Sequence, residues 1–219
     1  MKLTLFDLDH TLLTGDSDVL WCDFLMARGV LDSTEFAARN ADMETRYKAG
    51  TVGPQEFAEF YVGTLAGKTP AKWEPMRQEF LAEYVVPRVG QAARDLVQHH
   101  LDAGELVVMT TATNRFITEL TAMYFGIEHL LATEPELQDG TFTGRTRGTL
   151  NMREGKVTRL QEWLAAQGHK LEDFESTGYS DSINDLPLLK AVNHPVVVDP
   201  DAKLSAIAAD AGWPFLHLH

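Results

Sequence analysis

Short apolar runs alternate with longer amphipathic stretches along most of this chain. Short apolar runs bounded by polar residues predict strands, and apolar residues repeated at helical spacing predict helices. A regular alternation of the two predicts an α/β fold, in which a doubly wound parallel sheet carries helices on both faces. The predicted strands lie at 2–7, 105–110, 130–133, 175–180 and 195–199, and the predicted helices near 90–103, 114–125, 153–167, 184–192 and 201–211.

Residues 16–86 interrupt this alternation, because they show helical periodicity and no convincing strand. We therefore predict an inserted all-helical cap over the carboxyl edge of the sheet, with a core made of residues 1–15 and 87–219. Glycine is unfavourable inside a helix, so glycines mark the ends of the predicted cap helices. These breaks lie at Gly29, Gly50–Gly53 and Gly67–Pro70.

Two connections join the predicted cap to the core, at Gly15 and at Val86–Gly90, and we expect them to act as hinges. Closure of such a cap would exclude water from a reaction, and its opening would release the product. The segment 134–149 contains the turn signal Asp139-Gly140 between β-favouring residues. This pattern predicts a hairpin at the edge of the sheet.

Composition limits the possible partners. The chain has 219 residues, of which 44% are hydrophobic, and a formal charge of −13. A protein this acidic is poorly suited to bind nucleic acid or an anionic lipid surface. No run approaches the roughly 20 apolar residues of a membrane span, and no signal peptide is visible. Cys22 is the single cysteine, so no intrachain disulfide is possible, and we expect a cytoplasmic protein.

Two carboxylates, Asp7 and Asp9, follow the first predicted strand one residue apart. Open α/β sheets bind ligands at the carboxyl ends of their strands. Side chains in a strand repeat every two residues, so we expect both carboxylates to point the same way. Two like charges held close together repel each other unless a cation or a proton lies between them. The pattern therefore indicates a hard metal ion together with carboxylate chemistry.

Three later segments place polar residues at comparable positions. Thr111 and Thr113 follow a predicted strand and precede a helix, where they could bind a phosphate or simply cap the helix. Lys156 lies in the first turn of an amphipathic helix, where a positive charge interacts unfavourably with the helix dipole. This lysine could therefore have a specific anionic partner, or it could simply be solvated. The third segment, for which capping is again an alternative, contains Asp181, Asn184 and Asp185.

Taken in order, these segments resemble the haloacid dehalogenase superfamily of phosphatases. The resemblance covers the whole chain, and the long insert resembles the branch, subfamily IB, that contains phosphoserine phosphatases. The superfamily pattern is DxDx[TV], then a Ser or Thr that ends a strand, then a Lys, then an acidic motif such as GDxxxD. Here these elements stand as Asp7-Leu8-Asp9-His10-Thr11, Thr111, Lys156 and Asp181-Ser182-Ile183-Asn184-Asp185.

The resemblance implies a role for each residue in hydrolysing a phosphate monoester. Asp7 is expected to be the nucleophile that forms an aspartyl-phosphate, and Asp9 the general acid and then the base. Asp7, the backbone carbonyl of Asp9, and Asp181 are expected to hold Mg²⁺, with Asp185 orienting the surroundings of the metal. The expected ligands of the phosphate oxygens are Thr111, the Ala112 N–H, Lys156 and Asn184.

The resemblance also implies a small, amine-bearing substrate such as histidinol phosphate or phosphoserine. Asp16 stands where phosphoserine phosphatases carry an acidic residue that contacts the substrate amine, and Asp18 follows it, although Asp16 could equally be a turn residue. Those enzymes also carry a cap arginine for the substrate carboxylate, and Tyr61 stands in its place. Arg46 or Arg39 could replace it, or the substrate could lack a carboxylate.

Two other functions remain open at the level of the sequence. One is phosphoryl transfer to an acceptor other than water. The other is a non-enzymatic module that is regulated by phosphorylation of an aspartate, but Asp9 favours an enzyme because it offers the acid and base that turn the intermediate over. The expected partner is a small-molecule phosphate ester, and the expected assembly is a monomer or a homodimer.

Overall fold

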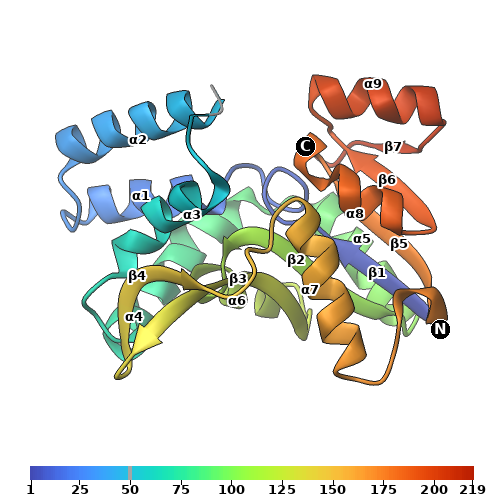
Figure 1. Ribbon diagram of the computed structural model, residues 1–219, viewed down its shortest axis with the longest axis horizontal. Coiled ribbons are helices and arrows are strands. Elements are labelled where there is room, and N and C mark those ends of the chain that lie inside the picture. Colours follow the sequence, from blue (N-terminus) through green and yellow to red (C-terminus); the bar gives the residue numbers. More distant parts are fainter. Residues whose placement is uncertain (49–50) are drawn as a thin grey trace.

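The structure, a computed structural model, describes residues 1–48 and 51–219. In this described part the strands form one seven-stranded sheet in the order β4-β3-β2-β1-β5-β6-β7 (Figure 1). All neighbouring strands are parallel except β3 and β4, which pair antiparallel. The strands are β1 (Lys2–Phe6), β2 (Leu106–Asn114), β3 (His129–Gln138), β4 (Thr141–Arg147), β5 (Glu175–Ser180), β6 (His194–Val198) and β7 (Phe215–Leu216).

Helices cover both faces of the sheet, which confirms the predicted fold class. In β1, Leu3 and Leu5 pack in one buried cluster with Leu160 of α7, whereas Phe6 belongs to a second cluster with Val97 of α5. This division follows from the two-residue repeat of a strand. The helices that follow the insert are α5 (Gln91–Asp102), α6 (Arg115–Tyr124), α7 (Glu154–Ala165), α8 (Leu186–Ala191) and α9 (Ala202–Ala211), with 3₁₀ turns at Leu171–Asp173 and Ile183–Asp185.

The described residues between 16 and 86 contain helices and no strand. Pro54 and Pro70 open α3 and α4 at positions where the missing N–H of proline costs no hydrogen bond. The predicted break at Gly50–Gly53 lies partly outside the described residues. The elements are α1 (Ser17–Ala27), α2 (Ser33–Lys48), α3 (Pro54–Val62), α4 (Pro70–Phe80), 3₁₀ turns at Gly63–Leu65 and Val86–Arg88, and a π-helical turn at Leu81–Val85.

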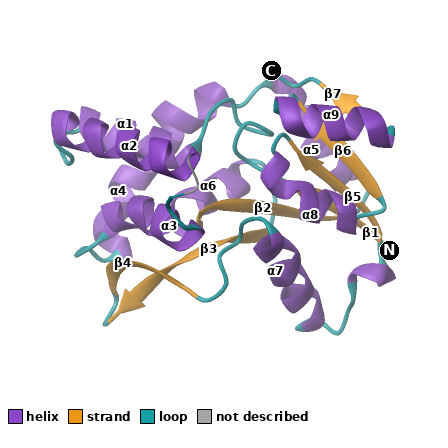
Figure 2. Cartoon of the chain, turned by 45° about the horizontal axis from the view of Figure 1, so that its top comes forward, coloured by secondary structure: helices purple, strands orange, loops and turns teal. Residues whose placement is uncertain are grey.

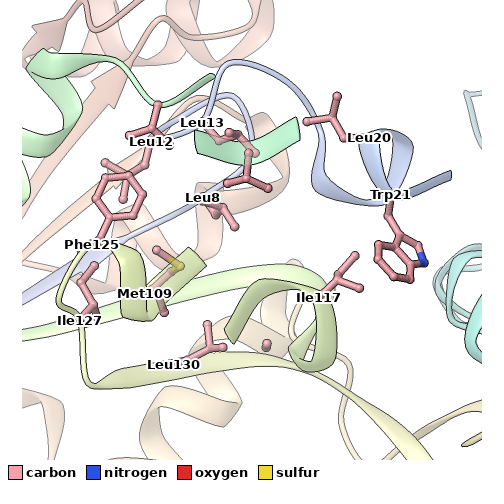
Figure 3. Close-up of a cluster of buried hydrophobic side chains, with 14 of the residues drawn as sticks. Leu8, Leu12, Leu13, Leu20, Trp21, Met109, Ile117, Phe125, Ile127 and Leu130 are labelled. Carbon is pink, nitrogen blue, oxygen red and sulfur yellow. The ribbon is translucent and has the colours of Figure 1, made fainter. Parts of the chain in front are cut away.

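The inserted helices share a buried cluster with the sheet. Figure 2 shows α1–α4 gathered at one end of the sheet, away from the N-terminus. Trp21 of α1 and Phe80 of α4 belong to the same buried cluster as Phe6 of β1 and Met109 of β2. Figure 3 places Trp21 beside Ile117 of α6 in this cluster. The division into a core domain (residues 1–15 and 87–219) and a cap domain (residues 16–86) therefore stays a prediction.

The predicted hairpin is formed by β3 and β4. Asp139 and Gly140 both have positive φ, 52° and 74°, as a tight hairpin turn requires. The hairpin is also bonded to the inserted segment, in the turn before α4, because Phe142 N–H donates to Lys68 O at 3.1 Å and Gly67 N–H donates to Phe142 O at 2.9 Å. A hinge motion of the inserted segment about Gly15 and Val86–Gly90 would either move the hairpin with it or break these two hydrogen bonds.

Two differences from the sequence prediction concern the strands. β2 continues through Thr111 to Asn114, beyond the predicted end of the strand. The sequence pattern does not predict β7, whose two residues pair with β6. Across the described residues, no helix combines the length and apolar character needed to span a membrane.

Candidate active site

The carboxyl ends of β1, β2 and β5 meet at a small cavity of about 240 Å³. Its volume suits a metabolite, since pockets for drug-sized ligands are typically about 300–1,000 Å³. Apart from Thr111 and the candidate arginines Arg46 and Arg39, the site residues named from the sequence line it. The lining residues are Asp7, Asp9, His10, Asp16, Asp18, Phe57, Ala112, Thr113, Met152, Lys156, Asp181, Ser182, Asn184 and Asp185.

Asp7 lies directly after β1 and is paired with a buried lysine. Lys156 Nζ donates to Asp7 Oδ1 and to Asp185 Oδ2, at 2.6 Å in each case. Burial raises the pKa of Asp7 to about 7, although the nearby Lys156 ammonium lowers it. Burial alone would lower the pKa of Lys156, but the charges of Asp185 and Asp7 raise it above its usual value. Lys156 is therefore a fixed cation, and the open alternative of a solvated lysine is wrong.

Asp9 has different partners from Asp7, although both line the cavity. β1 ends at Phe6, so the two-residue repeat of a strand does not extend to these carboxylates, and our reason for expecting them to point alike is wrong. Asp9 Oδ1 accepts hydrogen bonds from the N–H (2.7 Å) and the hydroxyl of Ser17. Burial and the charge of Asp16 raise the pKa of Asp9 to about 6, against the hydrogen bonds from Ser17 and Thr113.

The end of β2 forms a bulge beside Asp9. The register with β3 shifts between Thr111 and Asn114, which leaves Ala112 and Thr113 outside the ladder. Thr113 Oγ1 lies 3.0 Å from Asp9 Oδ2, and Thr111 Oγ1 lies 3.3 Å from the same oxygen. The cap of α6 is Asn114, whose Oδ1 accepts from Ile117 N–H. Thr111 is thus a buried strand residue and does not lie at a helix start, which corrects that part of the prediction.

Asn151 braces this bulge, and sequence reasoning missed it. The side chain is fully buried, and its Nδ2 donates to Thr111 O and Leu131 O at 2.9 Å and contacts Thr110 Oγ1 at 3.0 Å. These contacts tie the carboxyl end of β2 to β3 at the place where the backbone ladder is interrupted. An asparagine in a loop gives no sequence signal for such a role.

The end of β5 contributes the remaining acidic residues. Thr11 Oγ1 lies 3.1 Å from Asp7 Oδ2 and 3.2 Å from Asp181 Oδ1, and it accepts from Asp181 N–H at 3.1 Å. Burial and the charges of Asp7 and Asp185 raise the pKa of Asp181 to about 8. Asp185 accepts from the Ser180 hydroxyl at 2.7 Å as well as from Lys156. Asn184 lies in the 3₁₀ turn beside them and also lines the cavity.

The donor set fits Mg²⁺. Among the described residues, no cluster of three or more His, Cys, Asp or Glu side chains is arranged to hold a metal ion. Mg²⁺ does not require one, because it keeps several waters and takes one or two carboxylates. The Asp7 and Asp181 carboxylates converge on one hydroxyl. Besides burial, the charge of Asp7 repels that of Asp181 and raises the pKa of Asp181. A bound cation would relieve that repulsion.

The inserted helices bring further residues to the cavity. Asp16 caps α1 by accepting from Val19 N–H at 3.0 Å, and it lines the cavity as well. Thr113 Oγ1 also lies 3.2 Å from Asp18 Oδ2. Burial and the charges of Asp16 and Asp9 raise the pKa of Asp18 well above its usual value. Phe57 of α3 is a lining residue that sequence reasoning missed. It could have been found only by knowing how α3 packs.

The candidate arginines do not line the cavity. Arg46 pairs with Glu56 at 2.9 Å and with Asp42 at 3.6 Å, and Arg39 pairs with Glu35 at 3.9 Å. Tyr61 is buried in the inserted helices, where its hydroxyl donates to Asn40 Oδ1 at 3.0 Å. Lys156 is thus the one lysine or arginine among the described residues that line this cavity.

A larger cavity of about 600 Å³ lies elsewhere, between β3, β4, α6 and α7. Two of its arginines are paired with one carboxylate, since Arg115 and Arg159 both bond Glu134, at 2.9 Å and 3.0 Å. None of the acidic motif residues lines it. Size alone therefore does not identify a reaction site, whereas the acidic motif residues gather at the smaller cavity.

Comparisons with known proteins show which proteins this chain resembles. Residues 4–190 match the model of the haloacid dehalogenase-like hydrolase family. The chain is 40% identical to a histidinol-phosphatase of Neisseria meningitidis serogroup C (strain 8013), over 99% of this chain and 98% of that protein. It is 31% identical to a phosphoserine phosphatase of Mycobacterium tuberculosis (strain ATCC 25618 / H37Rv), over 95% and 68%. A protein with unknown function from Bordetella pertussis Tohama I has a crystal structure that matches with a TM-score of 0.97 and 45% identity, over 100% of this chain and 99% of that one.

Proposed function

Because the chain belongs to the haloacid dehalogenase-like hydrolase family, we propose that it hydrolyses a small phosphate monoester through a phosphorylated Asp7. The observation that carries this proposal is the contrast between two carboxylates in one cavity. Asp7 is paired with the Lys156 ammonium, whereas Asp9 is held by hydroxyl and amide donors. Two carboxylates in such different surroundings suit two different roles, nucleophile and acid.

In the first step, the Asp7 carboxylate attacks phosphorus and the bond from phosphorus to the alcohol oxygen breaks. Asp9 gives its proton to the departing oxygen, so an aspartyl-phosphate and a neutral alcohol result. In the second step, the Asp9 carboxylate takes a proton from water as the water oxygen attacks phosphorus. This releases inorganic phosphate, restores Asp7 and leaves Asp9 protonated for the next turnover.

Asp9 is suited to the acid role by its surroundings. Burial and the neighbouring Asp16 charge raise its pKa to about 6, and a Mg²⁺ ion held by the Asp7 carboxylate would keep Asp7 ionised while Asp9 carries the proton. The hydrogen bonds from Ser17 and Thr113 fix the carboxyl beside the cavity. Asp9 can therefore give and take a proton without a large change of position.

The phosphate charge would be met by fixed donors. Lys156 supplies a buried cation, while the Ala112 N–H, Thr111 and Asn184 lie around the same end of the sheet. Such preorganised donors are often the largest contribution to catalysis. A Mg²⁺ ion held by Asp7, the Asp9 carbonyl and Asp181 would neutralise further phosphate charge. Asp185 would hold the Lys156 ammonium in place and orient the groups around the metal.

The acidic lining favours an amine-bearing alcohol. Asp16 and Asp18 line the cavity from the inserted segment, and no arginine joins them among the described lining residues. An ammonium group would be attracted by these carboxylates, while a substrate carboxylate would be repelled. Histidinol phosphate, an amino alcohol phosphate without a carboxylate, is therefore our first candidate, and it agrees with the name of the Neisseria relative. We place the reaction in the cytoplasm.

The test is an assay with Mg²⁺ against histidinol phosphate, phosphoserine and sugar phosphates, with mass spectrometry of acid-quenched protein. Wild type should release phosphate from histidinol phosphate and carry a transient phosphate on Asp7. Asp7→Asn should lose both, Asp9→Asn should lose turnover, and Asp210→Asn, an exposed change on α9, should behave as wild type. Full activity in Asp7→Asn would refute the proposal.

A further inference from the structure

Phe57 gives the site cavity an aromatic wall. Among the described lining residues it is the one phenyl ring, and it comes from α3 in the inserted segment. The groups assigned to catalysis come from the strand ends, the loops and α7. None of the proposed chemical steps uses it. An apolar ring that faces a cavity lined by six aspartates has a cost in hydration, which contact with another apolar group would offset.

Phe57 is held in place from two sides. Its ring packs edge-to-face on Tyr61, with centroids 5.3 Å apart and planes at 71°, and Tyr61 is itself 3% exposed. Two residues before Phe57 on α3, Gln55 Nε2 donates to Thr146 Oγ1 of β4 at 2.6 Å. Glu59 Oε1 accepts from Thr146 N–H at 3.4 Å. The helix that presents Phe57 is thus fixed to the hairpin of the sheet.

We propose that Phe57 is a specificity-determining residue that packs against a flat heteroaromatic ring on the alcohol part of the substrate. The inference rests on the proposed phosphatase function and narrows its substrate class to esters that carry both an amine and such a ring. Offset or edge contacts between rings stabilise beyond simple burial. A protonated imidazole would gain further from the face of a phenyl ring and from the acidic lining.

Phe60 on the same helix provides a matched control. It stacks on Phe36, with centroids 5.2 Å apart and planes at 25°, and it is absent from the cavity lining. Phe57→Leu and Phe60→Leu therefore remove the same ring from α3, but only the first removes it from the cavity. Leucine keeps an apolar side chain at both positions, which limits the loss of packing.

The experiment compares kcat/KM for histidinol phosphate and for 2-aminopropyl phosphate, an amino alcohol phosphate without a ring. We expect Phe57→Leu to lower kcat/KM about tenfold for the ring-bearing ester and to leave the ringless one nearly unchanged. Phe60→Leu should keep the wild-type ratio of the two values. An equal loss on both esters, an unchanged ratio in Phe57→Leu, or the same change in Phe60→Leu would overturn the inference.

A second measurement separates this inference from the proposed function. Calorimetry gives the Kd of histidinol phosphate for Asp7→Asn, for Asp7→Asn with Phe57→Leu, and for Asp7→Asn with Phe60→Leu, without any turnover. If wild type hydrolyses no ester, the proposed function fails, yet weaker binding caused by Phe57→Leu alone would still support the aromatic contact. If wild type hydrolyses the ringless ester as well as histidinol phosphate, the function stands and the role of Phe57 is refuted.

Discussion

Gly155 packs so closely on Leu150 that a Cβ atom on the glycine would overlap the Leu150 carbonyl oxygen. This contact closes the loop between β4 and α7. The loop carries Asn151, which braces the bulge of β2, and leads into Lys156, which binds Asp7. One tight backbone contact therefore positions two parts of the site.

Gly155→Ala tests this relationship. The overlapping atoms are backbone atoms, which cannot rotate away, so the loop must shift. We expect a loss of about 1–3 kcal/mol in the free energy of unfolding, together with a fall in kcat/KM as Lys156 moves. Denaturant unfolding and steady-state kinetics measure the two effects. Gly63→Ala, where a Cβ meets no atom within 4 Å, is the control. Wild-type values in Gly155→Ala would contradict the prediction.

Lys156→Met should affect both folding and chemistry. The substitution leaves the buried Asp7 and Asp185 carboxylates without their shared cation. Breaking a buried ion pair on one side costs about 3–5 kcal/mol, and the pKa of Asp7 should rise further, which removes the nucleophile at neutral pH. Thermal unfolding and phosphate release measure these losses. Lys190→Met at the exposed end of α8 should leave both unchanged, and a stable, active Lys156→Met would show that the pairing is dispensable.

Glu105 gives a prediction for the dependence of stability on pH. Burial would raise its pKa, but hydrogen bonds from Thr4 (2.6 Å) and His100 (2.6 Å) outweigh burial and lower it below 4.5. A lowered carboxyl pKa contributes stability above the unfolded pKa of 4.5, and this stability is lost as the pH falls through the lower folded value. Glu105→Gln should therefore destabilise the protein by about 2 kcal/mol at pH 7.

The difference between Glu105→Gln and wild type should shrink as the pH is lowered below 4.5. Chemical unfolding between pH 3.5 and pH 7 would measure it. Glu172→Gln, an exposed change, should show little difference at any pH. A constant difference for Glu105→Gln over the whole range would mean that its charge does not contribute.

Magnesium should stabilise the folded protein through Asp181. A ligand that binds only the folded state at about 100 times its Kd adds about 2.7 kcal/mol. We expect Mg²⁺ to raise the Tm of wild type and of Asp210→Asn, and not that of Asp181→Asn. Calorimetry with Mg²⁺ and then with a chelator measures this. An equal rise in Asp181→Asn would place the metal elsewhere.

Local sequence patterns predicted the strand ends that carry Asp7, Asp9 and Asp181 because short apolar runs followed by polar residues are local features. The same patterns could not predict the role of Asn151. Asn151 acts by bonding Thr111 O and Leu131 O, which are 40 and 20 positions away along the chain. Such a contact exists only after β2 and β3 have paired.

The alternation of apolar and polar residues by itself determined the parallel sheet, its helical layers and the inserted helices. The order of the acidic, threonine and lysine motifs identified the family. Only the tertiary structure decided that Lys156 lies between Asp7 and Asp185, that Arg46 stays outside the cavity, and that Phe57 lines it. The physical reason is that a periodic pattern fixes which face of an element is buried. The partner that a side chain meets across the cavity depends on how separate elements pack, which no local spacing records.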